Sequence, residues 1–317
     1  MAKFRGSYII AYTPFTEGGA AVDHEGLRRF IDWQIKEGTH GLIALGSFGQ
    51  FLSITDDERT AIVESFVGQS ARRAPVLVGT MDAHTPNAVR YSKEAEALGA
   101  DGIMVAPPYY YTPTEDEIFA YYKEISEAVS IPIMLYNNPF TTNVDMSAAL
   151  VARLTKAFEN VRYIKESSSF ADRIYDIERL TDGVMNSFAG SRVYESFLMG
   201  AAGYVSPPGS YAPRQSAQMW ESLENGDLAG GKLLSDKFAE LARTMRAGHP
   251  PYGNLCYNRE LVRLAGYPIG DPRPPFFPWR RSAKRAPNAW PRSRRCSRIS
   301  ARSTWRRPPP SSPREAN

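Results

Sequence analysis

Residues 131–136, with the sequence Ile-Pro-Ile-Met-Leu-Tyr, and residues 161–164, with the sequence Val-Arg-Tyr-Ile, belong to a set of eight short apolar runs. The other six runs are Tyr8–Tyr12, Gly41–Leu45, Pro75–Val78, Gly102–Ala106, Val184–Ala189 and Gly203–Ser206. They are continuously apolar rather than alternating, as expected for parallel strands covered on both faces. Segments with helical periodicity separate them, as at residues 27–35, where apolar side chains return every three or four positions. Strands and helices that alternate in this way predict a closed (β/α)8 barrel.

An open, doubly wound sheet is the alternative architecture for such a pattern. That fold usually carries a Gly-rich turn after its first strand, whereas this chain has Thr13-Pro14-Phe15 there. After residue 213, helical patterns at 215–223, 228–246 and 255–264 exceed what an eighth barrel helix needs. We therefore expect an α/β fold with a TIM-barrel core at residues 1–213. The last barrel helix and a small C-terminal helical appendage should occupy residues 214–271.

The end of the chain differs in composition from the rest. Residues 280–317 hold twelve Lys and Arg residues and one Glu, a net charge of +11, so the preceding 279 residues carry −7. Residues 272–317 are rich in Pro, Arg and Ser and lack a helical period, which predicts a disordered or poorly packed tail. A nucleic-acid-binding tail is one interpretation. We favour the other, a frameshifted reading of a GC-rich gene, and expect no nucleic-acid partner.

Composition restricts the class of protein. With 43% hydrophobic and 23% charged residues, the chain has the balance of a soluble globular enzyme. Its apolar runs are too short to cross a bilayer, and its first seven residues lead into no apolar signal segment. Cys256 and Cys296 lie far from any His or Cys at metal-binding spacing, which argues against a disulfide framework and a metal site. We expect a cytoplasmic enzyme without membrane contact.

The carboxyl ends of the strands carry the chemistry in TIM-barrel enzymes. Lys165 directly follows the apolar run at 161–164. Burial inside a barrel favours the uncharged amine, which can attack a ketone and form a Schiff base. A lysine that reaches solvent from a strand end is the alternative. Tyr136 ends the preceding run, where its phenol would either exchange protons beside Lys165 or pack as an ordinary aromatic side chain.

Five motifs, in their order and spacing, resemble those of one enzyme family. They are Gly6-Ser7 with Thr13-Pro14-Phe15, Gly46-Ser47-Phe48-Gly49-Gln50, Pro108-Tyr109-Tyr110, Tyr136-Asn137-Asn138-Pro139 and Ile164-Lys165-Glu166. Over residues 5–278 the chain resembles the dihydrodipicolinate synthase / N-acetylneuraminate lyase family of pyruvate-dependent aldolases. The resemblance favours the catalytic interpretation of Lys165 and Tyr136 over the structural one.

The resemblance implies a role for each matching residue. Lys165 is expected to be the Schiff-base lysine, and Tyr136 the tyrosine that transfers protons. Ser47 corresponds to the first hydroxyl of a loop that relays protons to this tyrosine and holds the keto-acid carboxylate. Tyr110 corresponds to a tyrosine that a neighbouring subunit inserts into the site.

The same resemblance implies the rest of the pocket and the assembly. Gly190 and Val205 correspond to positions that line the pyruvate pocket. Family members are usually homotetramers, built as dimers of dimers. They need neither a metal nor an organic cofactor. A small 2-keto acid is therefore the expected partner, held as an imine.

Two departures from the family bear on the substrate. Phe48 replaces the second hydroxyl of the loop and Gln50 replaces its acid, so a donor is lost and an apolar ring is gained. Some hydratase-aldolases of aromatic degradation resemble this chain in having Phe at that position. The stretch Phe140-Thr141-Thr142-Asn143 lacks the arginine that grips aspartate semialdehyde in lysine-pathway synthases. Thr141 and Thr142 can bind a substrate hydroxyl but cannot replace a bidentate guanidinium.

These departures favour a hydroxylated or aromatic 2-keto acid that is cleaved or dehydrated through the Lys165 imine. Ser167, in the run Ser-Ser-Ser at 167–169, would add a hydroxyl contact or else cap the next helix. Authentic 4-hydroxy-tetrahydrodipicolinate synthase and a barrel that binds a keto acid without turnover are the alternatives. The joint presence of Lys165, Tyr136, Ser47 and Tyr110 favours an enzyme over a simple binder.

Overall fold

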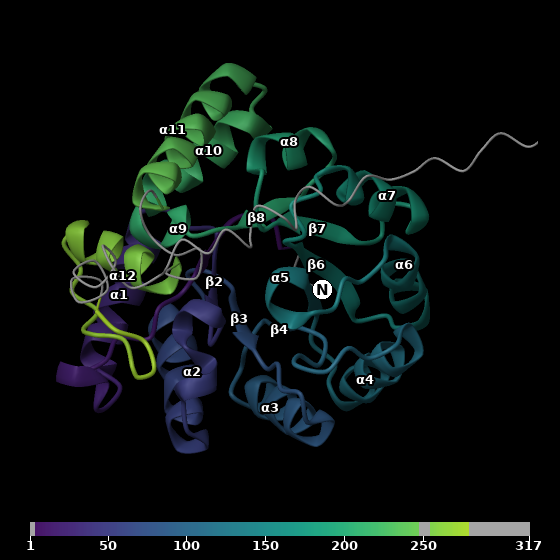
Figure 1. Cartoon of the computed structure of the whole chain (residues 1–317), viewed down its shortest axis with the longest axis horizontal. Coiled ribbons are helices and arrows are strands. Elements are labelled where there is room, and N and C mark those ends of the chain that lie inside the picture. Colours follow the sequence, from purple (N-terminus) through teal and green to yellow (C-terminus); the bar gives the residue numbers. More distant parts are fainter. Residues whose placement is uncertain (1–3, 247–253, 279–317) are drawn as a thin grey trace, which may run out of the picture.

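Eight parallel strands pair in chain order in the computed structural model, which describes residues 4–246 and 254–278 (Figure 1). They are β1 (Gly6–Ile10), β2 (Gly41–Ala44), β3 (Val76–Gly79), β4 (Gly102–Val105), β5 (Ile133–Asn137), β6 (Val161–Glu166), β7 (Asn186–Ala189) and β8 (Gly203–Val205). Gly6 of β1 pairs with Gly203 of β8, which closes the sheet into a barrel. The predicted fold class is confirmed, and this closure excludes an open sheet.

One helix follows each strand and covers the outside of the barrel (Figure 1). These helices are α1 (His24–Lys36), α2 (Asp56–Ser70), α3 (Thr85–Ala97), α4 (Glu115–Ala128), α6 (Ala148–Ala157), α7 (Asp172–Leu180), α8 (Val193–Leu198) and α10 (Pro213–Glu224). Capping boxes start α2 at Thr55 and α4 at Thr114, and the third helical residue is a glutamate in each. Such caps satisfy the first free N–H groups and fix where the preceding loop ends.

Short helical turns occupy the loops after several strands. η1 (Glu17–Gly19) follows β1, η2 (Ser47–Gly49) and η3 (Phe51–Ser53) follow β2, α5 (Pro139–Thr142) follows β5 and α9 (Pro208–Tyr211) follows β8. The strands are only three to six residues long. Side chains in these turns therefore lie close above the mouth of the barrel.

An aromatic cluster fills the barrel interior away from that mouth. Phe4, Tyr8, Tyr163 and Phe188 are buried, with ring centroids 4.7 to 6.2 Å apart. A Cβ at Gly41 would lie 2.1 Å from the Tyr8 ring, so the glycine makes room for it. Burial raises the pKa of Tyr8 far above its ordinary value, so the phenol stays neutral. This end of the barrel is packed, and the opening lies at the carboxyl ends of the strands.

Helices α11 (Leu228–Arg246) and α12 (Asn254–Leu264) form the appendage that the sequence predicts. In Figure 1, α11 lies along α10 outside the ring of barrel helices, and α12 contacts α9. Phe238 of α11 packs edge-on against Tyr211, with centroids 6.5 Å apart. The predicted helical segments agree with α10, α11 and α12 to within two residues, and α10 begins at the predicted division, residue 213.

The segment after α12 corrects one prediction. The sequence pattern places the start of a poorly packed tail at residue 272, yet Pro272 is buried and Arg273 is bonded to several barrel groups. Arg273 donates to the backbone oxygen of Ser53 and to the carboxylate of Glu58, each at 2.7 Å. The loss of pattern reflects a strap-like path over the barrel rather than a loss of packing. The rest of the predicted tail, from residue 279, lies outside the described residues.

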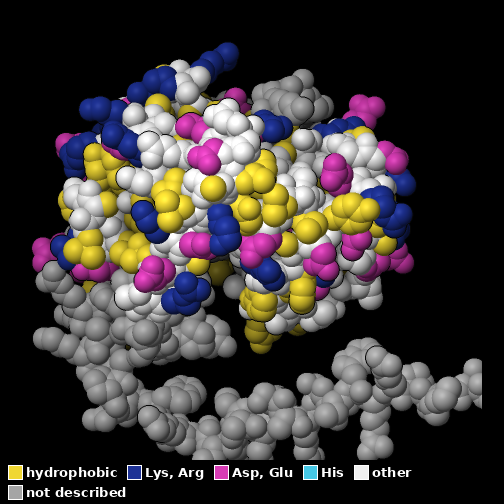
Figure 2. All heavy atoms as spheres, turned by 90° about the horizontal axis from the view of Figure 1, so that it is seen from above, with side chains coloured by type: hydrophobic (Ala, Val, Ile, Leu, Met, Phe, Trp, Pro, Cys, Tyr) yellow, Lys and Arg dark blue, Asp and Glu magenta, His cyan; other side chains and the backbone are white. Residues whose placement is uncertain are grey.

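Charged side chains of both signs lie on the face of the described residues that Figure 2 shows. Figure 2 shows Lys and Arg side chains mixed with Asp, Glu and apolar side chains over one face. None of the helices in residues 4–246 and 254–278 is long and apolar enough to cross a membrane. The strong positive charge of the sequence therefore resides in its last residues.

Candidate active site

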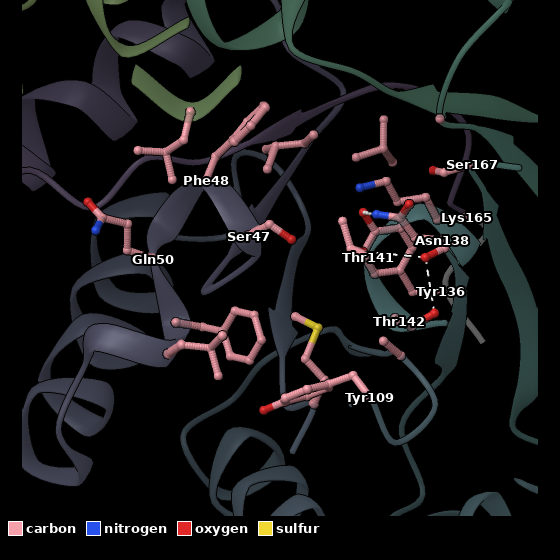
Figure 3. Close-up of a pocket in the computed structure, with 18 of the residues that line it drawn as sticks. Ser47, Phe48, Gln50, Tyr109, Tyr136, Asn138, Thr141, Thr142, Lys165 and Ser167 are labelled. Carbon is pink, nitrogen blue, oxygen red and sulfur yellow. Dashed lines mark hydrogen bonds between the residues drawn. The ribbon is translucent and has the colours of Figure 1, made fainter. Parts of the chain in front are cut away.

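A cavity of about 450 Å³ opens at the carboxyl ends of the strands (Figure 3). It is lined by Ile10, Ser47, Phe48, Gln50, Phe51, Leu52, Ser53, Met81, Ala106, Tyr109, Tyr136, Asn138, Thr141, Thr142, Lys165, Ser167, Gly190, Val205, Pro207, Leu255 and Phe276. Every residue that the sequence places in the pocket is among them except Tyr110. Lys165 is the one Lys, Arg, His, Asp or Glu residue in this lining, which therefore holds one basic group and no carboxylate.

Lys165 lies near the end of β6, beside Tyr136 on β5. The lysine is 3% exposed, and its Nζ lies 4.0 Å from the centroid of the Tyr136 ring. The adjacent Glu166 does not neutralise it, because the Glu166 carboxylate accepts hydrogen bonds from Asn137 Nδ2 at 3.0 Å and Ser168 N at 2.6 Å. Within the described part of the chain, no ion pair or hydrogen bond engages the Lys165 amine. The amine can therefore contact a molecule bound in the cavity.

Tyr136 has its phenol oxygen held from one side. The Asn138 side-chain amide donates a hydrogen bond of 2.8 Å to Tyr136 Oη. The oxygen therefore acts as an acceptor toward Asn138, and its own proton remains available to a group in the cavity. Asn138 is a partner that the sequence prediction did not name, although it stands within the Tyr136-Asn137-Asn138-Pro139 motif.

Ser47 begins η2 and projects its hydroxyl into the cavity from the side opposite Lys165 and Tyr136 (Figure 3). The described residues contain no direct hydrogen bond between Ser47 and Tyr136. The position fits the predicted contact with a substrate, whereas the predicted proton relay to Tyr136 stays a prediction.

Phe48 forms a fixed wall of the cavity. Its ring is 8% exposed and stacks on Tyr12, with centroids 5.3 Å apart and planes 4° from parallel. The Arg259 guanidinium lies 5.7 Å from the Tyr12 ring centroid and donates to the backbone oxygens of Thr13 and Gly270 at 3.1 and 2.9 Å. Burial lowers the pKa of Arg259 to about 10, so it remains charged at neutral pH. The Phe48 ring is therefore backed by buried, hydrogen-bonded groups.

Two adjacent tyrosines in the loop after β4, Tyr109 and Tyr110, lie differently with respect to the cavity. Tyr110 is 81% exposed and lies outside the cavity of its own chain, whereas Tyr109 lines it. Burial raises the pKa of Tyr109, and its ring packs edge-on against Phe51, with centroids 6.2 Å apart. The sequence prediction missed Tyr109 because the motif match pointed to its neighbour. The predicted insertion of Tyr110 into another subunit is not tested by a single chain.

Thr141 and Thr142 both line the cavity from α5, but their hydroxyls are already used. Thr142 Oγ1 donates to the backbone oxygens of Asn138 and Val144, at 3.0 and 3.1 Å. Thr141 Oγ1 lies 3.3 Å from the same Asn138 oxygen, a longer bond at an exposed position. Thr141 can therefore turn toward a substrate more readily than Thr142.

The remaining predicted positions also meet at the cavity. Ser167, Gly190 and Val205 line it from the ends of β6, β7 and β8. A Cβ at Gly190 would lie 1.8 Å from Oγ of Ser167, so only glycine allows these two loops to pass so closely. The sequence did not reveal Leu255 of α12 or Phe276 beyond it, because neither belongs to a strand end.

Metal ligands are not gathered in the described residues, where no group of three His, Cys, Asp or Glu side chains is placed to hold an ion. Cys256, which the sequence already set apart from metal spacing, is a buried free thiol. The polar side-chain groups of the cavity lining include an amine, phenols and hydroxyl groups.

The chain is similar in sequence to proteins of one known family. The profile of the Dihydrodipicolinate synthetase family matches residues 3–289. The chain belongs to this family. It is 35% identical over 245 residues to the 4-hydroxy-tetrahydrodipicolinate synthase of Rhizobium meliloti (strain 1021), which is 76% of this chain and 83% of that protein.

Solved structures of the family have the same fold. YagE, a prophage protein of the dihydrodipicolinic acid synthase family from E. coli K12, was solved in complex with pyruvate. It superposes with a TM-score of 0.83 at 29% identity, over 89% of this chain and 96% of its own. Dihydrodipicolinate synthase from Thermotoga maritima superposes with a TM-score of 0.81 at 28% identity, over 87% and 93% of the two chains.

These similarities confirm the predicted family and the predicted class of enzyme, a dihydrodipicolinate synthase-like lyase. They favour an enzyme over a barrel that binds a keto acid without turnover. The Schiff base on Lys165, the absence of a cofactor, the tetramer and the cytoplasmic location stay predictions.

Proposed function

We propose that the chain forms a Schiff base between Lys165 and pyruvate or a related 2-keto acid, and uses the resulting enamine in aldol chemistry or dehydration. The observation that carries this proposal is the Lys165 amine, 3% exposed and engaged by no carboxylate of the described residues, 4.0 Å from the Tyr136 ring. Imine formation needs an amine that can reach the ketone carbon of the substrate, and the Lys165 amine lies in the cavity lining.

The neighbouring groups fit the proton transfers of this reaction. Lys165 Nζ attacks C2 of the keto acid, and the carbonyl oxygen takes up protons and departs as water. Tyr136 is placed to supply one of these protons, because Asn138 donates to its oxygen and leaves the phenol proton free. Loss of a proton from C3 then gives an enamine whose C3 attacks an aldehyde. In the reverse direction the C3–C4 bond breaks and its electrons pass to the iminium nitrogen.

The loop after β2 is the proposed binding site of the keto-acid carboxylate. Ser47 presents its hydroxyl to the cavity across from Lys165, and the backbone N–H of Phe48 follows as the second residue of η2. Successive N–H groups in such a turn favour an anion. A carboxylate held here would direct the adjacent ketone toward the lysine on the far wall.

Authentic 4-hydroxy-tetrahydrodipicolinate synthase is the second candidate, because curated relatives carry that name. Its aldehyde substrate bears a carboxylate, and the described cavity lining holds no cation besides Lys165. An unpaired carboxylate in a partly desolvated pocket is unfavourable. Comparable specificity constants for aspartate semialdehyde and for uncharged aldehydes would favour this second candidate.

We also propose a homotetramer, a reaction without metal or organic cofactor, and a cytoplasmic location. Tyr110 and Tyr111 support the assembly, because both are more than three-quarters exposed and pack edge-to-face against each other. Exposed aromatic residues of this kind are enriched in subunit interfaces. The Lys165 iminium itself serves as the electron sink. Light scattering of the wild type and of Tyr110→Ser tests the assembly.

Reductive trapping tests the central proposal. The protein is incubated with pyruvate and sodium borohydride, and its intact mass is measured. One reduced pyruvate adduct is expected on the wild type and none on Lys165→Ala. Lys93→Ala is the matched control, since Lys93 is an exposed residue of α3 and should leave the adduct unchanged. A wild type without adduct, or equal adducts on Lys165→Ala, would overturn the assignment.

A further inference from the structure

Part of the cavity lining is apolar and largely aromatic. It is made of aromatic and aliphatic side chains from four separate parts of the chain, namely Phe48, Phe51, Leu52, Tyr109, Leu255 and Phe276. None of them is charged. The whole cavity, about 450 Å³, falls within the range of pockets that take up entire small organic molecules, which is more than a three-carbon keto acid requires.

The segment after α12 supplies part of this wall and is tied down on the barrel. The Arg273 guanidinium donates to the backbone oxygens of Gly19 and Ser53, at 2.9 and 2.7 Å, and to both oxygens of the Glu58 carboxylate. The hydrogen bonds from Arg273 lower the pKa of Glu58 to about 2. The Arg273 side chain is only 12% exposed, so this is an anchored strap rather than a surface ion pair. Phe276 follows three residues later.

The same strap is fastened to the loop that departs from the family pattern. Gln50 donates from Nε2 to the Arg273 backbone oxygen and accepts at Oε1 from the Arg273 N–H, each at 3.2 Å. Gln50 is 3% exposed and follows directly on Phe48 and Gly49. Gln50, two residues after Phe48, is therefore hydrogen-bonded to Arg273, three residues before Phe276.

We infer that residues 272–277 act as a specificity strap, in which Arg273 positions Phe276 to complete a subsite for an uncharged aryl group. This inference rests on the proposed Lys165 imine for its reaction. Flat rings pack well against the faces and edges of other aromatic rings. A carboxylate at the same place would lose water without gaining a cation. Phe276 is thus a specificity-determining residue, and Arg273 is the residue that positions it.

The reaction at this subsite balances with pyruvate and an aryl aldehyde alone. C3 of the Lys165 enamine attacks the aldehyde carbon, so one C–C bond forms and the carbonyl electrons pass to oxygen, which takes a proton. Water then hydrolyses the iminium, which restores the amine and releases a 4-aryl-4-hydroxy-2-keto acid. Loss of water from C3 and C4 gives the arylidene pyruvate, and the reverse sequence cleaves it.

The test compares two aldehydes that differ in charge and shape. Condensation of pyruvate with benzaldehyde and with glyoxylate is measured on the full chain. The wild type should have the higher kcat/KM with benzaldehyde. Phe276→Ala should lower kcat/KM for benzaldehyde by about tenfold or more, while kcat/KM for glyoxylate and the yield of the pyruvate–borohydride adduct stay unchanged. Arg273→Gln should also lower the ratio of kcat/KM for benzaldehyde to kcat/KM for glyoxylate. Phe277→Ala is the control, because its ring is 53% exposed and does not line the cavity.

A wild type that prefers glyoxylate, or a Phe276→Ala protein that loses both reactions equally, overturns the inference. Binding of benzyl alcohol to Lys165→Ala protein tests the subsite without the imine. Titration by NMR should show saturable binding that Phe276→Ala weakens at least severalfold, with circular dichroism confirming the fold. Loss of the borohydride adduct together with retained benzyl alcohol binding would overturn the proposed function and support the subsite.

Discussion

Gly190 stands where the loop after β7 passes the end of β6, and a side chain has no room there. A Cβ at Gly190 would lie 1.8 Å from Oγ of Ser167, 2.8 Å from its Cβ and 2.9 Å from the backbone oxygen of Glu166. The Gly190 N–H also donates to this Glu166 oxygen at 2.7 Å, which fixes the separation of the two backbones. Gly190→Ala must therefore displace the ends of β6 and β7, next to Lys165.

The atoms in contact set the size of the effect. The Ser167 hydroxyl can rotate away, but its Cβ and the Glu166 oxygen move only if the strand ends move. Overpacking of this kind costs about 1–3 kcal/mol, so the free energy of unfolding should fall by roughly 2 kcal/mol. Because the displaced atoms flank Lys165, imine formation with pyruvate should slow by a factor on the order of ten to one hundred.

Urea unfolding followed by circular dichroism measures the stability, and the rate of borohydride trapping measures imine formation. Gly68→Ala is the matched control. Gly68 lies inside α2, and a Cβ added there meets nothing within 4 Å. Alanine is favoured over glycine within a helix by about 0.5–1 kcal/mol. The same chemical change should therefore lower stability at residue 190 and raise it at residue 68.

A second substitution identifies the clash. Ser167→Gly in the Gly190→Ala background removes two of the three close atoms and should restore part of the lost stability, which a double-mutant cycle measures. Retained stability in Gly190→Ala, within about 0.5 kcal/mol of the wild type, would refute the close packing of these loops. A loss that Ser167→Gly fails to relieve would place the clash at the Glu166 backbone instead.

Three further predictions concern the phenol, the strap and the aromatic wall. Tyr136→Phe keeps the ring and removes only the phenol oxygen, so kcat for the proposed aldol reaction should fall by about 10²–10⁴-fold in steady-state assays. Arg273 lowers the pKa of Glu58 from 4.5 to about 2. Their pairing therefore stabilises the fold at pH values above the unfolded-state pKa of Glu58, and this stabilisation is lost as the pH falls from about 4.5 to about 2. Urea midpoints at pH 7 and pH 3 should therefore differ less in Arg273→Gln than in the wild type, and an equal difference would contradict the pairing. Phe48→Leu removes the stack on Tyr12 and should lower the free energy of unfolding by about 1 kcal/mol, measured in urea.

The sequence predicts the fold and the reactive centre because both follow from local patterns. Continuous apolar runs set the strands, and parallel strands in a closed barrel bring their carboxyl ends to one mouth. That topology alone places Lys165 beside Tyr136 and Ser47 across from them, although the three are far apart in the chain. The same reasoning locates Gly190 and Val205, since each stands at or just beyond a strand end.

The parts that the sequence does not predict depend on tertiary contacts. Tyr109 and Tyr110 are adjacent and alike, and only the backbone path decides which of them faces the cavity; φ of Tyr110 is +81° and turns the chain there. Leu255 and Phe276 enter the wall from beyond the barrel, where no periodic rule connects them to the strand ends. Arg273 stands in a Pro- and Arg-rich stretch whose composition conceals its specific hydrogen bonds.

Gln50 shows why the altered loop and the strap form one feature. Its φ of +54° lies in the left-handed region, which is costly for a long side chain unless its surroundings hold it. The amide both donates to and accepts from the Arg273 backbone. A glutamate would keep the accepted bond but has no proton to donate, and its charge would face the Arg273 carbonyl oxygen without compensation. The acid of the family loop is thus incompatible with this path of residues 272–277. Gln50, one of the two residues of this loop that depart from the family pattern, thus binds the backbone of the segment that carries Phe276.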